Sequence, residues 1–372
     1  GVLIPFTQQV LLDVSENGIK LNKVMNLTAD SVASIFEDRN GRVWVAASPK
    51  SGYFDANGVF HIIKCDGFDE FISCIYEDYQ GNIWGASSHY GVIKLSQSNF
   101  VNVFERAGQE ARVVNASVVY AGDYYFGTDN GLVILNQNSL QQVNNEITKR
   151  LEGIRIRSLF IDSHENLWIC TYKENDFHLY DVLTQNTSSD RFRCITELND
   201  ETIVAGTADG INYIKGGKVV NVLNADDGMQ NTQILTLAEA GDGILLAGSD
   251  GSGIYVIENG VITNTLTKEN GLSSGVVLRL IPCEHGFLVV TSNSLCHMSE
   301  NYKITKLTSF PYFNNYDIIV EGQMAYVTCS AGVYKVKLGD LCANKVTQYE
   351  LYDVNEGLGV GLTANSWNDR TQ

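Results

Sequence analysis

The chain has 372 residues, of which 44% are hydrophobic and only 19% are charged, so it can bury a sizeable core. Its formal net charge is −17 and it has no basic stripe, which disfavours binding to the phosphate backbone of nucleic acids. The sequence has no run of about 18 apolar residues, so no membrane-spanning helix is expected.

One sequence motif recurs along the chain. It reads IFEDRNGRVWVAAS from Ile35, IYEDYQGNIWGASS from Ile75 and LFIDSHENLWICTY from Leu159. Weaker copies continue towards the C-terminus. Eight units with a period near 40 residues can be aligned on the residue three positions after the tryptophan, namely Ala47, Ser87, Thr128, Thr171, Thr207, Ser249, Thr291 and Cys329.

Each unit predicts four short strands. A β-rich run leads into a turn that holds Asp and Gly, and a second run leads into a short polar turn. A third run and a weaker fourth run follow, the fourth for example at residues 100–104, 219–223 and 345–351. A four-stranded sheet of this size has two faces to bury and can do so by packing radially between two neighbours. The apolar residues alternate or run in fours and fives, which argues against helical repeats.

The predicted fold is therefore all-β, a β-propeller with a single ring of seven or eight four-stranded blades. Residues 1–372 are expected to form one domain. Residues 353–372 are expected to be a closing strand, completed by strands from residues 1–25, or the start of the next element. The eight units are expected near residues 31–65, 71–108, 112–148, 154–190, 192–226, 233–270, 276–310 and 316–352.

The turn between the first and second strands predicts a scaffold. Asp38 and Asp78 can accept hydrogen bonds from backbone N–H groups a few residues on. Gly41 and Gly81 can supply the positive φ that such a hairpin requires. The tryptophan that follows can plug the space between neighbouring blades. A calcium loop is the alternative, but the turn lacks the ligand count that calcium needs.

The eight cysteines form no C-x-x-C motif, and none stands beside a histidine at metal-binding spacing. Cys74, Cys170 and Cys194 fall within apolar runs, so they are expected to be buried thiols. The even count also permits disulfides. No metal and no cofactor are expected.

The first two copies of the recurring motif resemble the two-component regulator propeller repeat, which reads V-x-x-I-x-x-D-x-x-G-N-x-W-h-G-T-x-x-G-L, with h apolar. The third and fourth units fit this repeat less well, and the later units keep only its pattern of strands and turns. The resemblance implies an extracytoplasmic, ligand-sensing region of a bacterial membrane receptor. It also implies an output module beyond a transmembrane helix, either a histidine kinase or a diguanylate cyclase.

The candidate ligand site lies in the diverse polar turns after the second strands and at the starts of the inner strands. Uniform turns suit scaffolding, whereas diverse loops on a rigid ring suit recognition. Arginine can clamp a carboxylate or a sugar acid, and tyrosine or histidine can stack on a sugar. The candidates are His89, Tyr90, Arg112, Asp129, Asn130, Arg155, Arg157, Tyr172, Lys173, Asp176, Arg193 and Asp250.

Three functions remain open. The first is a non-catalytic sensor that binds a small molecule or oligosaccharide and acts as a homodimer, with membrane attachment only through segments outside residues 1–372. The second is a propeller enzyme, a polysaccharide lyase or glycosidase, that uses His89 or Asp176. It is disfavoured because the sequence offers no partnered catalytic groups. The third is a protein-interaction platform.

Overall fold

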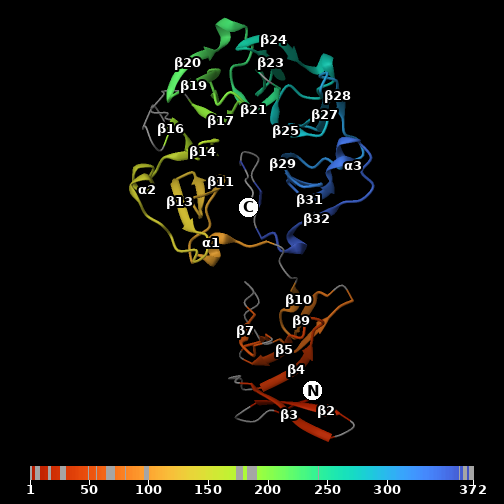
Figure 1. The fold of residues 1–372 in the computed structure, drawn as a ribbon. Helices are drawn as coiled ribbons and strands as arrows, with labels where there is room; N and C mark the ends of the chain where they lie inside the picture. The colour runs from red at the N-terminus through yellow and green to blue at the C-terminus, as the bar shows by residue number, and fades with distance from the viewer. Residues whose placement is uncertain are drawn as a thin grey trace. The chain divides into compact units, whose positions relative to one another are not determined.

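The computed structural model describes residues 2–4, 9–15, 18–25, 31–48, 50–55, 57–63, 72–79, 81–95, 100–172, 179–181, 191–241, 243–359, 361–362 and 367 (Figure 1). The chain divides into two compact units. The first holds residues 1–99 with 355–357, and the second holds residues 100–354 with 358–372. No helix among the described residues is long and apolar enough to cross a membrane.

The described residues of the first unit form three antiparallel sheets. One consists of β1 (Val2–Ile4), β2 (Gln9–Ser15) and β3 (Gly18–Met25). The next consists of β4 (Ser31–Glu37), β5 (Val43–Ser48), β6 (Gly52–Phe54) and β7 (Phe60–Ile62). The third consists of β8 (Cys74–Glu77), β9 (Ile83–Ser87) and β10 (Gly91–Leu95). Trp44 and Ala46 of β5 pack on Ile75 and Ile83 of the third sheet.

Within the described part of the second unit there are six antiparallel sheets, which follow one another around an arc in Figure 1. Their innermost strands lie side by side in the order β11, β14, β17, β21, β25 and β29. The strands are β11 (Val114–Tyr120), β12 (Asp123–Thr128), β13 (Gly131–Asn136), β14 (Arg155–Ile161), β15 (Leu167–Tyr172), β16 (Leu179–Asp181), β17 (Phe192–Glu197), β18 (Ile203–Thr207), β19 (Ile211–Lys215), β20 (Lys218–Leu223), β21 (Ile234–Gly241), β22 (Ile244–Ser249), β23 (Ile254–Glu258), β24 (Val261–Leu266), β25 (Val277–Cys283), β26 (Gly286–Thr291), β27 (Leu295–Ser299), β28 (Ile304–Lys306), β29 (Asn315–Glu321), β30 (Met324–Cys329), β31 (Gly332–Lys337) and β32 (Glu350–Tyr352). The helices are α1 (Val103–Arg106), α2 (Glu146–Arg150), α3 (Leu338–Cys342), η1 (Ala225–Asp227), η2 (Lys268–Asn270) and η3 (Val354–Glu356).

Eight of the nine sheets coincide with the eight predicted units, so the predicted all-β propeller class is confirmed. One detail differs from the prediction. The segment expected as a fourth strand at residues 100–104 instead begins helix α1, because the Asn102 side chain accepts a hydrogen bond from the Glu105 N–H and caps it.

Glycine in the second strand lets neighbouring sheets approach closely. A Cβ placed on Gly127 would lie 2.5 Å from Ile156, and one on Gly206 would lie 2.7 Å from Ile234. Both isoleucines belong to the inner strand of the following sheet and are fully buried. The glycine of the repeat is therefore a packing requirement between blades, since any side chain would push the next inner strand away.

The connections between sheets repeat a second local motif. In η1 the Asn224 side chain caps a 3-10 turn that ends at Gly228, with φ of 97°, and Met229 is then 3% exposed. In η2 Thr267 caps the turn and Gly271 ends it, with φ of 104°. In both connections a glycine with positive φ is followed by a buried apolar residue, Met229 or Leu272, which anchors the connection.

The C-terminal segment contacts the first inner strand of the second unit. Trp367 forms a parallel bridge with Ala116 of β11. Its N–H donates to the Asn115 carbonyl at 2.8 Å. Strands β1 to β3 pair with one another and form a sheet of their own. The alternative in which residues 1–25 complete a closing strand at residues 353–372 therefore finds no pairing among the described residues.

Candidate functional site

The inner strands share one irregularity, a β-bulge near the start of each. The register shifts between Ile156 and Ser158 in β14 and between Phe192 and Cys194 in β17. The same shift occurs in the four other inner strands of the second unit. A bulge re-aims the extra residue away from the ladder. The extra residues are Asn115, Arg157, Arg193, Leu235, Leu278 and Tyr316.

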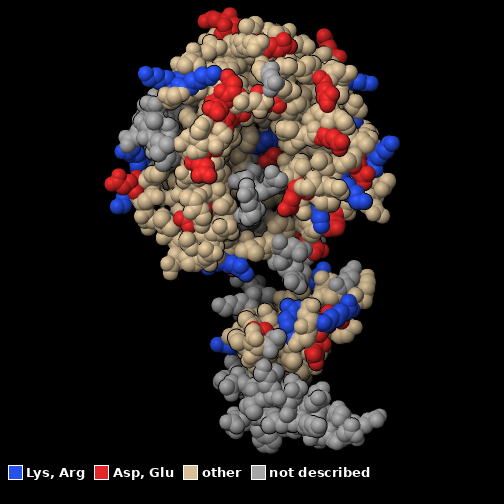
Figure 2. All heavy atoms as spheres, viewed as in Figure 1, with Lys and Arg blue, Asp and Glu red and all other residues tan. Residues whose placement is uncertain are grey.

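Four of these bulge residues meet in one cavity of about 130 Å³, here called the central cavity. It is lined by Arg157, Arg193, Leu235, Leu278, Arg279 and Trp367. Figure 2 shows a hollow in the middle of this unit, with basic and acidic side chains in its depth. Three guanidinium groups border this small space, and arginine side chains suit an anionic group such as a carboxylate.

Two of the predicted ligand residues, Arg157 and Arg193, are therefore brought together. The Arg193 Nη2 atom donates to the Gln233 Oε1 atom at 3.0 Å, and this bond holds the Arg193 side chain at the cavity. The spacing of the repeat placed both residues at the start of inner strands, and the bulges then turn their side chains inward.

Arg279 belongs to the same cavity and was not predicted. It is 6% exposed, its Nη1 atom donates to the Leu278 carbonyl, and its guanidinium lies 4.0 Å from the centre of the Trp367 ring. Burial lowers its pKa, whereas the Asp317 carboxylate, 3.5 Å from the Arg279 Nε atom, opposes that shift. Arg279 follows its bulge by one residue, a position that the repeat did not single out.

Arg155 and Asp129 form a second pair among the predicted residues. The Arg155 Nε atom lies 2.7 Å from the Asp129 Oδ1 atom, which also accepts a hydrogen bond from the Asn115 side chain. This ion pair links the turn after β12 to the start of β14. Both charged groups are more than a third exposed, so the pair contributes little stability.

The other predicted residues are not gathered at one site. Arg112, Asn130 and Asp250 are exposed in the second unit. His89 and Tyr90 lie in the exposed turn after β9, in the first unit. Tyr172 ends β15, but its side chain, like Lys173 and Asp176, lies outside the described residues.

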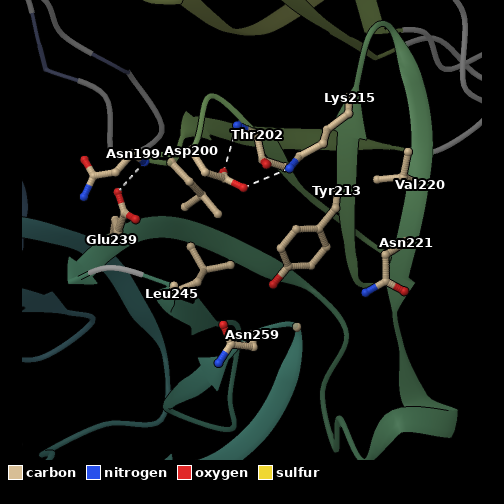
Figure 3. A pocket seen from close by; sticks show the side chains of 13 residues that line it. Asn199, Asp200, Thr202, Tyr213, Lys215, Val220, Asn221, Glu239, Leu245 and Asn259 are labelled. Carbon is tan, nitrogen blue, oxygen red and sulfur yellow. Dashed lines mark hydrogen bonds and ion pairs between the residues drawn. The ribbon is translucent and has the colours of Figure 1, made fainter.

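A larger pocket, here called the interblade pocket, lies between the β17–β20 and β21–β24 sheets. It has a volume of about 660 Å³, within the range of small-molecule sites. It opens at the turns between first and second strands and between third and fourth strands, the end of the sheets that the sequence assigned to scaffolding. Figure 3 shows its lining, which consists of Leu198, Asn199, Asp200, Thr202, Tyr213, Lys215, Val220, Asn221, Glu239, Gly243, Leu245, Asn259 and Gly260.

The interblade pocket combines an aromatic ring with many hydrogen-bonding groups. The Lys215 Nζ atom lies 2.9 Å from the Asp200 Oδ2 atom, and a bond from Thr202, then one from Lys215, lowers the pKa of Asp200 to about 2. Burial raises the pKa of Tyr213 to about 12 and so keeps its hydroxyl protonated. Gly243 and Gly260 lack side chains beside Asn259 and Asn221, which leaves room for both amides. No sequence motif marked these residues.

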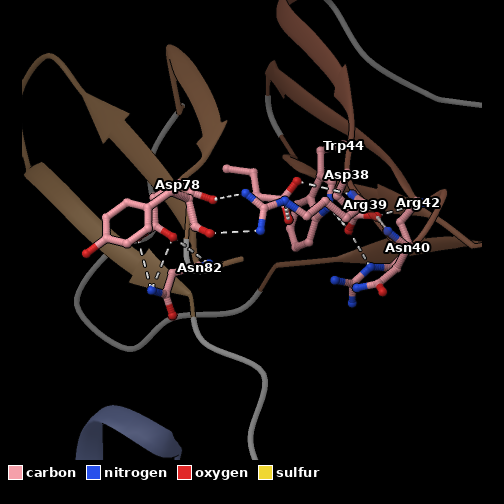
Figure 4. Close-up of polar contacts among 9 residues, drawn as sticks. Asp38, Arg39, Asn40, Arg42, Trp44, Asp78 and Asn82 are labelled. Carbon is pink, nitrogen blue, oxygen red and sulfur yellow. Dashed lines mark hydrogen bonds and ion pairs between the residues drawn. The ribbon is translucent and has the colours of Figure 1, made fainter.

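The Asp turns of the repeat have the predicted scaffold role, as Figure 4 shows for the first unit. The Asp38 carboxylate accepts backbone N–H bonds from Asn40 and Arg42. It also accepts the indole N–H of Trp44 at 2.8 Å, a bond that the sequence did not predict. Arg39 reaches across to the carbonyls of Asp78 and Tyr79 in the next turn, at 3.0 and 2.8 Å.

The third copy of this turn keeps the same bonds without its glycine. Asp162 accepts the Trp168 indole N–H at 2.7 Å, and Glu165 adopts φ of 63° where Gly41 has φ of 75°. We call this arrangement, shared by Asp38 with Trp44, Asp78 with Trp84 and Asp162 with Trp168, the Asp–Trp turn.

The cysteines only partly follow the sequence prediction. Cys170 and Cys194 are buried, as predicted, and burial raises the pKa of each thiol. The prediction for Cys74 is wrong, because its side chain is exposed on β8. The alternation along β8 buries Ile75 instead.

Comparison with known proteins supports the repeat and the fold. Residues 26–48 and 66–89 match the family described as Two component regulator propeller, and these are the units in which the sequence resembles it best. No curated protein matches the chain at a significant level.

Among solved structures, the chain is similar to one described as the extracellular domain of the hybrid two component system BT3049 from B. thetaiotaomicron. The identity is 17% and the TM-score 0.62, over 95% of this chain and 55% of that one. The corresponding domain of BT4673 from the same organism is 15% identical with a TM-score of 0.54, over 92% of this chain and 52% of that one. This chain thus spans about half the length of each. The chain carries two component regulator propeller repeats and has a β-propeller fold.

Proposed function

We propose that this chain is a ligand-sensing, non-catalytic part of the extracellular region of a bacterial two-component receptor. The repeat match and the fold of the two similar extracellular domains support this role. The proposal implies an extracytoplasmic location, attachment to the membrane through segments outside residues 1–372, and a kinase or cyclase output in the same protein. Signalling would then pass through a homodimer whose assembly or geometry responds to the ligand.

The main structural support for a ligand-binding role is the interblade pocket. Its lining offers amide, carboxylate, hydroxyl and ammonium groups around the Tyr213 ring, a combination of donors and acceptors that suits a polyhydroxylated ligand. Asp200 and Lys215 neutralise each other, and the Glu239 carboxylate leaves the lining with a net negative charge, which disfavours anionic ligands. We therefore assign the ligand to the neutral oligosaccharides.

The experiment is a calorimetric screen of the purified chain against neutral and acidic oligosaccharides. A ligand that binds the interblade pocket should bind at least about 10-fold more weakly to Asn221→Ala or Tyr213→Phe, because each change removes a hydrogen-bonding group. Asn138→Ala, on an exposed turn of the same unit, is the matched control and should bind normally. Full affinity in both pocket variants would reject this site.

The central cavity favours a second ligand class. Arg157, Arg193 and Arg279 converge there, and arginine pairs well with carboxylates. If an acidic oligosaccharide binds instead, Arg157→Ala and Arg193→Ala should lose affinity while Asn221→Ala does not. If neither class binds, the assignment to oligosaccharides is wrong.

The two other functions predict different results. An enzyme would cleave a polysaccharide and lose that activity in His89→Ala or Asp176→Asn. An interaction platform would capture a defined protein partner and bind no glycan. Light scattering with and without ligand tests whether the chain forms the homodimer that the sensor proposal requires.

A further inference from the structure

Two cysteines and one histidine, far apart in the sequence, converge between the seventh and eighth units of the repeat series. Cys283 ends β25, His297 lies on β27, and Cys342 ends α3. Their ligand atoms all lie within 4.8 Å of one another. The first two residues belong to one sheet, and α3 follows the third strand of the next sheet.

The sheet geometry explains how Cys283 and His297 meet across the strand that separates them. In β26, Leu288 pairs with His297, and Gly286 pairs with Cys283. Residues two apart on a strand share a face, so Cys283 and His297 project from the same side of the sheet. Cys342 reaches this face from α3, next to the buried Leu341.

His297 provides an independent observation. Its Nε2 atom is buried and has no hydrogen-bond partner among the described residues. A buried polar atom without a partner is costly, and a metal ion would satisfy it. His297 and Cys342 both line an adjoining pocket of about 560 Å³, together with Glu284, His285 and Asp340.

We propose that Cys283, His297 and Cys342 bind a zinc ion, a function that is separate from ligand sensing and that clamps two neighbouring blades together. Two thiolates and an imidazole are a typical zinc donor set. With zinc–sulfur bonds of about 2.3 Å, tetrahedral geometry puts two sulfur ligands about 3.8 Å apart, which the observed cluster can accommodate. Two thiolates also neutralise the charge of the ion. The fourth position faces the adjoining pocket, where water can fill it.

No sequence motif marks this site, because its ligands come from a strand end, a strand interior and a helix in two different blades. A disulfide between Cys283 and Cys342 is the competing outcome. It would form by two-electron oxidation of the two thiols and would remove both sulfur ligands. Cys283 and Cys342 are both free thiols in the structure and form no disulfide.

The test uses the whole chain, reduced with a phosphine and then incubated with zinc or cobalt. We expect one zinc per chain by elemental analysis, a cobalt spectrum with thiolate-to-metal charge transfer, and a melting temperature that rises with added zinc. Cys283→Ser, Cys342→Ser and His297→Gln should each weaken zinc binding by on the order of 100-fold or more. Cys74→Ser changes the exposed cysteine on β8 and is the matched control, which should keep its zinc.

Circular dichroism of each variant separates a lost site from a lost fold, and the cobalt spectrum of the unaltered chain does not depend on any variant folding. Zinc binding that survives His297→Gln would overturn the proposed ligand set. No zinc binding by the reduced chain would overturn the site, as would a cobalt spectrum without thiolate bands. In either case, peptide mapping under non-reducing conditions would show whether Cys283 and Cys342 form a disulfide.

Discussion

Two turns between the first and second strands of a blade differ in this protein, and we call one sealed and the other open. In the Asp–Trp turn the aspartate accepts bonds from its own backbone and from the tryptophan indole, as in Asp162 with Trp168. In the β17–β18 turn, Leu198 takes the place of the aspartate, because its N–H bonds to the Thr202 carbonyl as the Asp38 N–H bonds to Arg42. Val204 takes the place of the tryptophan, and Leu198 lines the interblade pocket.

The comparison indicates that the pocket lies where a repeat unit has lost its aspartate and its tryptophan. A sealed turn needs its aspartate, so it cannot vary without loss of stability. Once the aspartate and tryptophan are replaced by Leu198 and Val204, the turn no longer supplies these bonds, and the space beside it becomes available to a ligand. The four predictions below test this contrast, from the largest expected effect to the smallest.

Removing the aspartate of a sealed turn should have the largest effect. Asp162 is 7% exposed and accepts four hydrogen bonds, including that of the buried Trp168 indole. We expect Asp162→Ala to lower the free energy of unfolding by about 3–5 kcal/mol, because these donors lose their acceptor. Urea denaturation measures the loss. Asp226→Ala, at an exposed position, should change stability by less than about 0.5 kcal/mol.

Acid should weaken the sealed turns next. Burial alone raises the pKa of Asp162, but the bonds from Trp168 and Asn166 outweigh it and hold the pKa below 3.8. Because the pKa is lower in the folded state, the carboxylate's contribution to stability is present above about pH 4 and is lost as the pH falls through the folded pKa. Unfolding measured between pH 5 and pH 2 should therefore show a flatter loss for Asp162→Asn than for the unaltered chain. Equal slopes would contradict the role of this carboxylate.

Sealing the open pocket should affect binding and spare stability. Val220 is 59% exposed at the pocket rim, so Val220→Trp can cover the opening without disturbing the core. We expect affinity for a pocket ligand to fall at least about 10-fold while the free energy of unfolding stays within about 0.5 kcal/mol. Val219→Trp changes the adjacent residue, which faces the other side of β20, and should leave affinity unchanged.

Breaking the ion pair of the open pocket should have the smallest effect of the four, and that effect is on stability. Lys215 and Asp200 are both more than half exposed, so water screens their attraction. We expect Lys215→Met to change the free energy of unfolding by less than about 1 kcal/mol. The pKa of Asp200, followed by NMR, should rise only part of the way towards 3.8, because the bond from Thr202 remains. A large loss of stability would show that this turn is as structural as the sealed ones.

Much of the fold could be predicted because each blade is specified locally. The period near 40 residues, the Asp turns and the strand patterns all act within one unit or between direct neighbours, and eight predicted units became eight sheets. The same local character hides the boundary after residue 99, since a repeat specifies a blade without stating which compact unit it joins.

The candidate sites were predicted less completely. Arg157 and Arg193 could be placed near the axis, because the starts of inner strands meet there in any propeller. Arg279 and Trp367 could not, since their contact depends on a bulge and on a distant C-terminal residue. The interblade pocket left no sequence signal, because its lining is defined by the absence of the Asp–Trp turn.

By itself the sequence determined the strands, the turns and the blade as the repeating element, since alternation, turn residues and period are local properties. Only the tertiary structure decided which side chains share a site. The bulges turned Arg157 and Arg193 inward, the loss of one sealed turn opened a pocket between two blades, and the packing of α3 on β30 and β31 brought Cys342 next to Cys283 and His297. These outcomes depend on contacts between residues far apart in the chain. A local sequence pattern does not specify which distant residues come into contact.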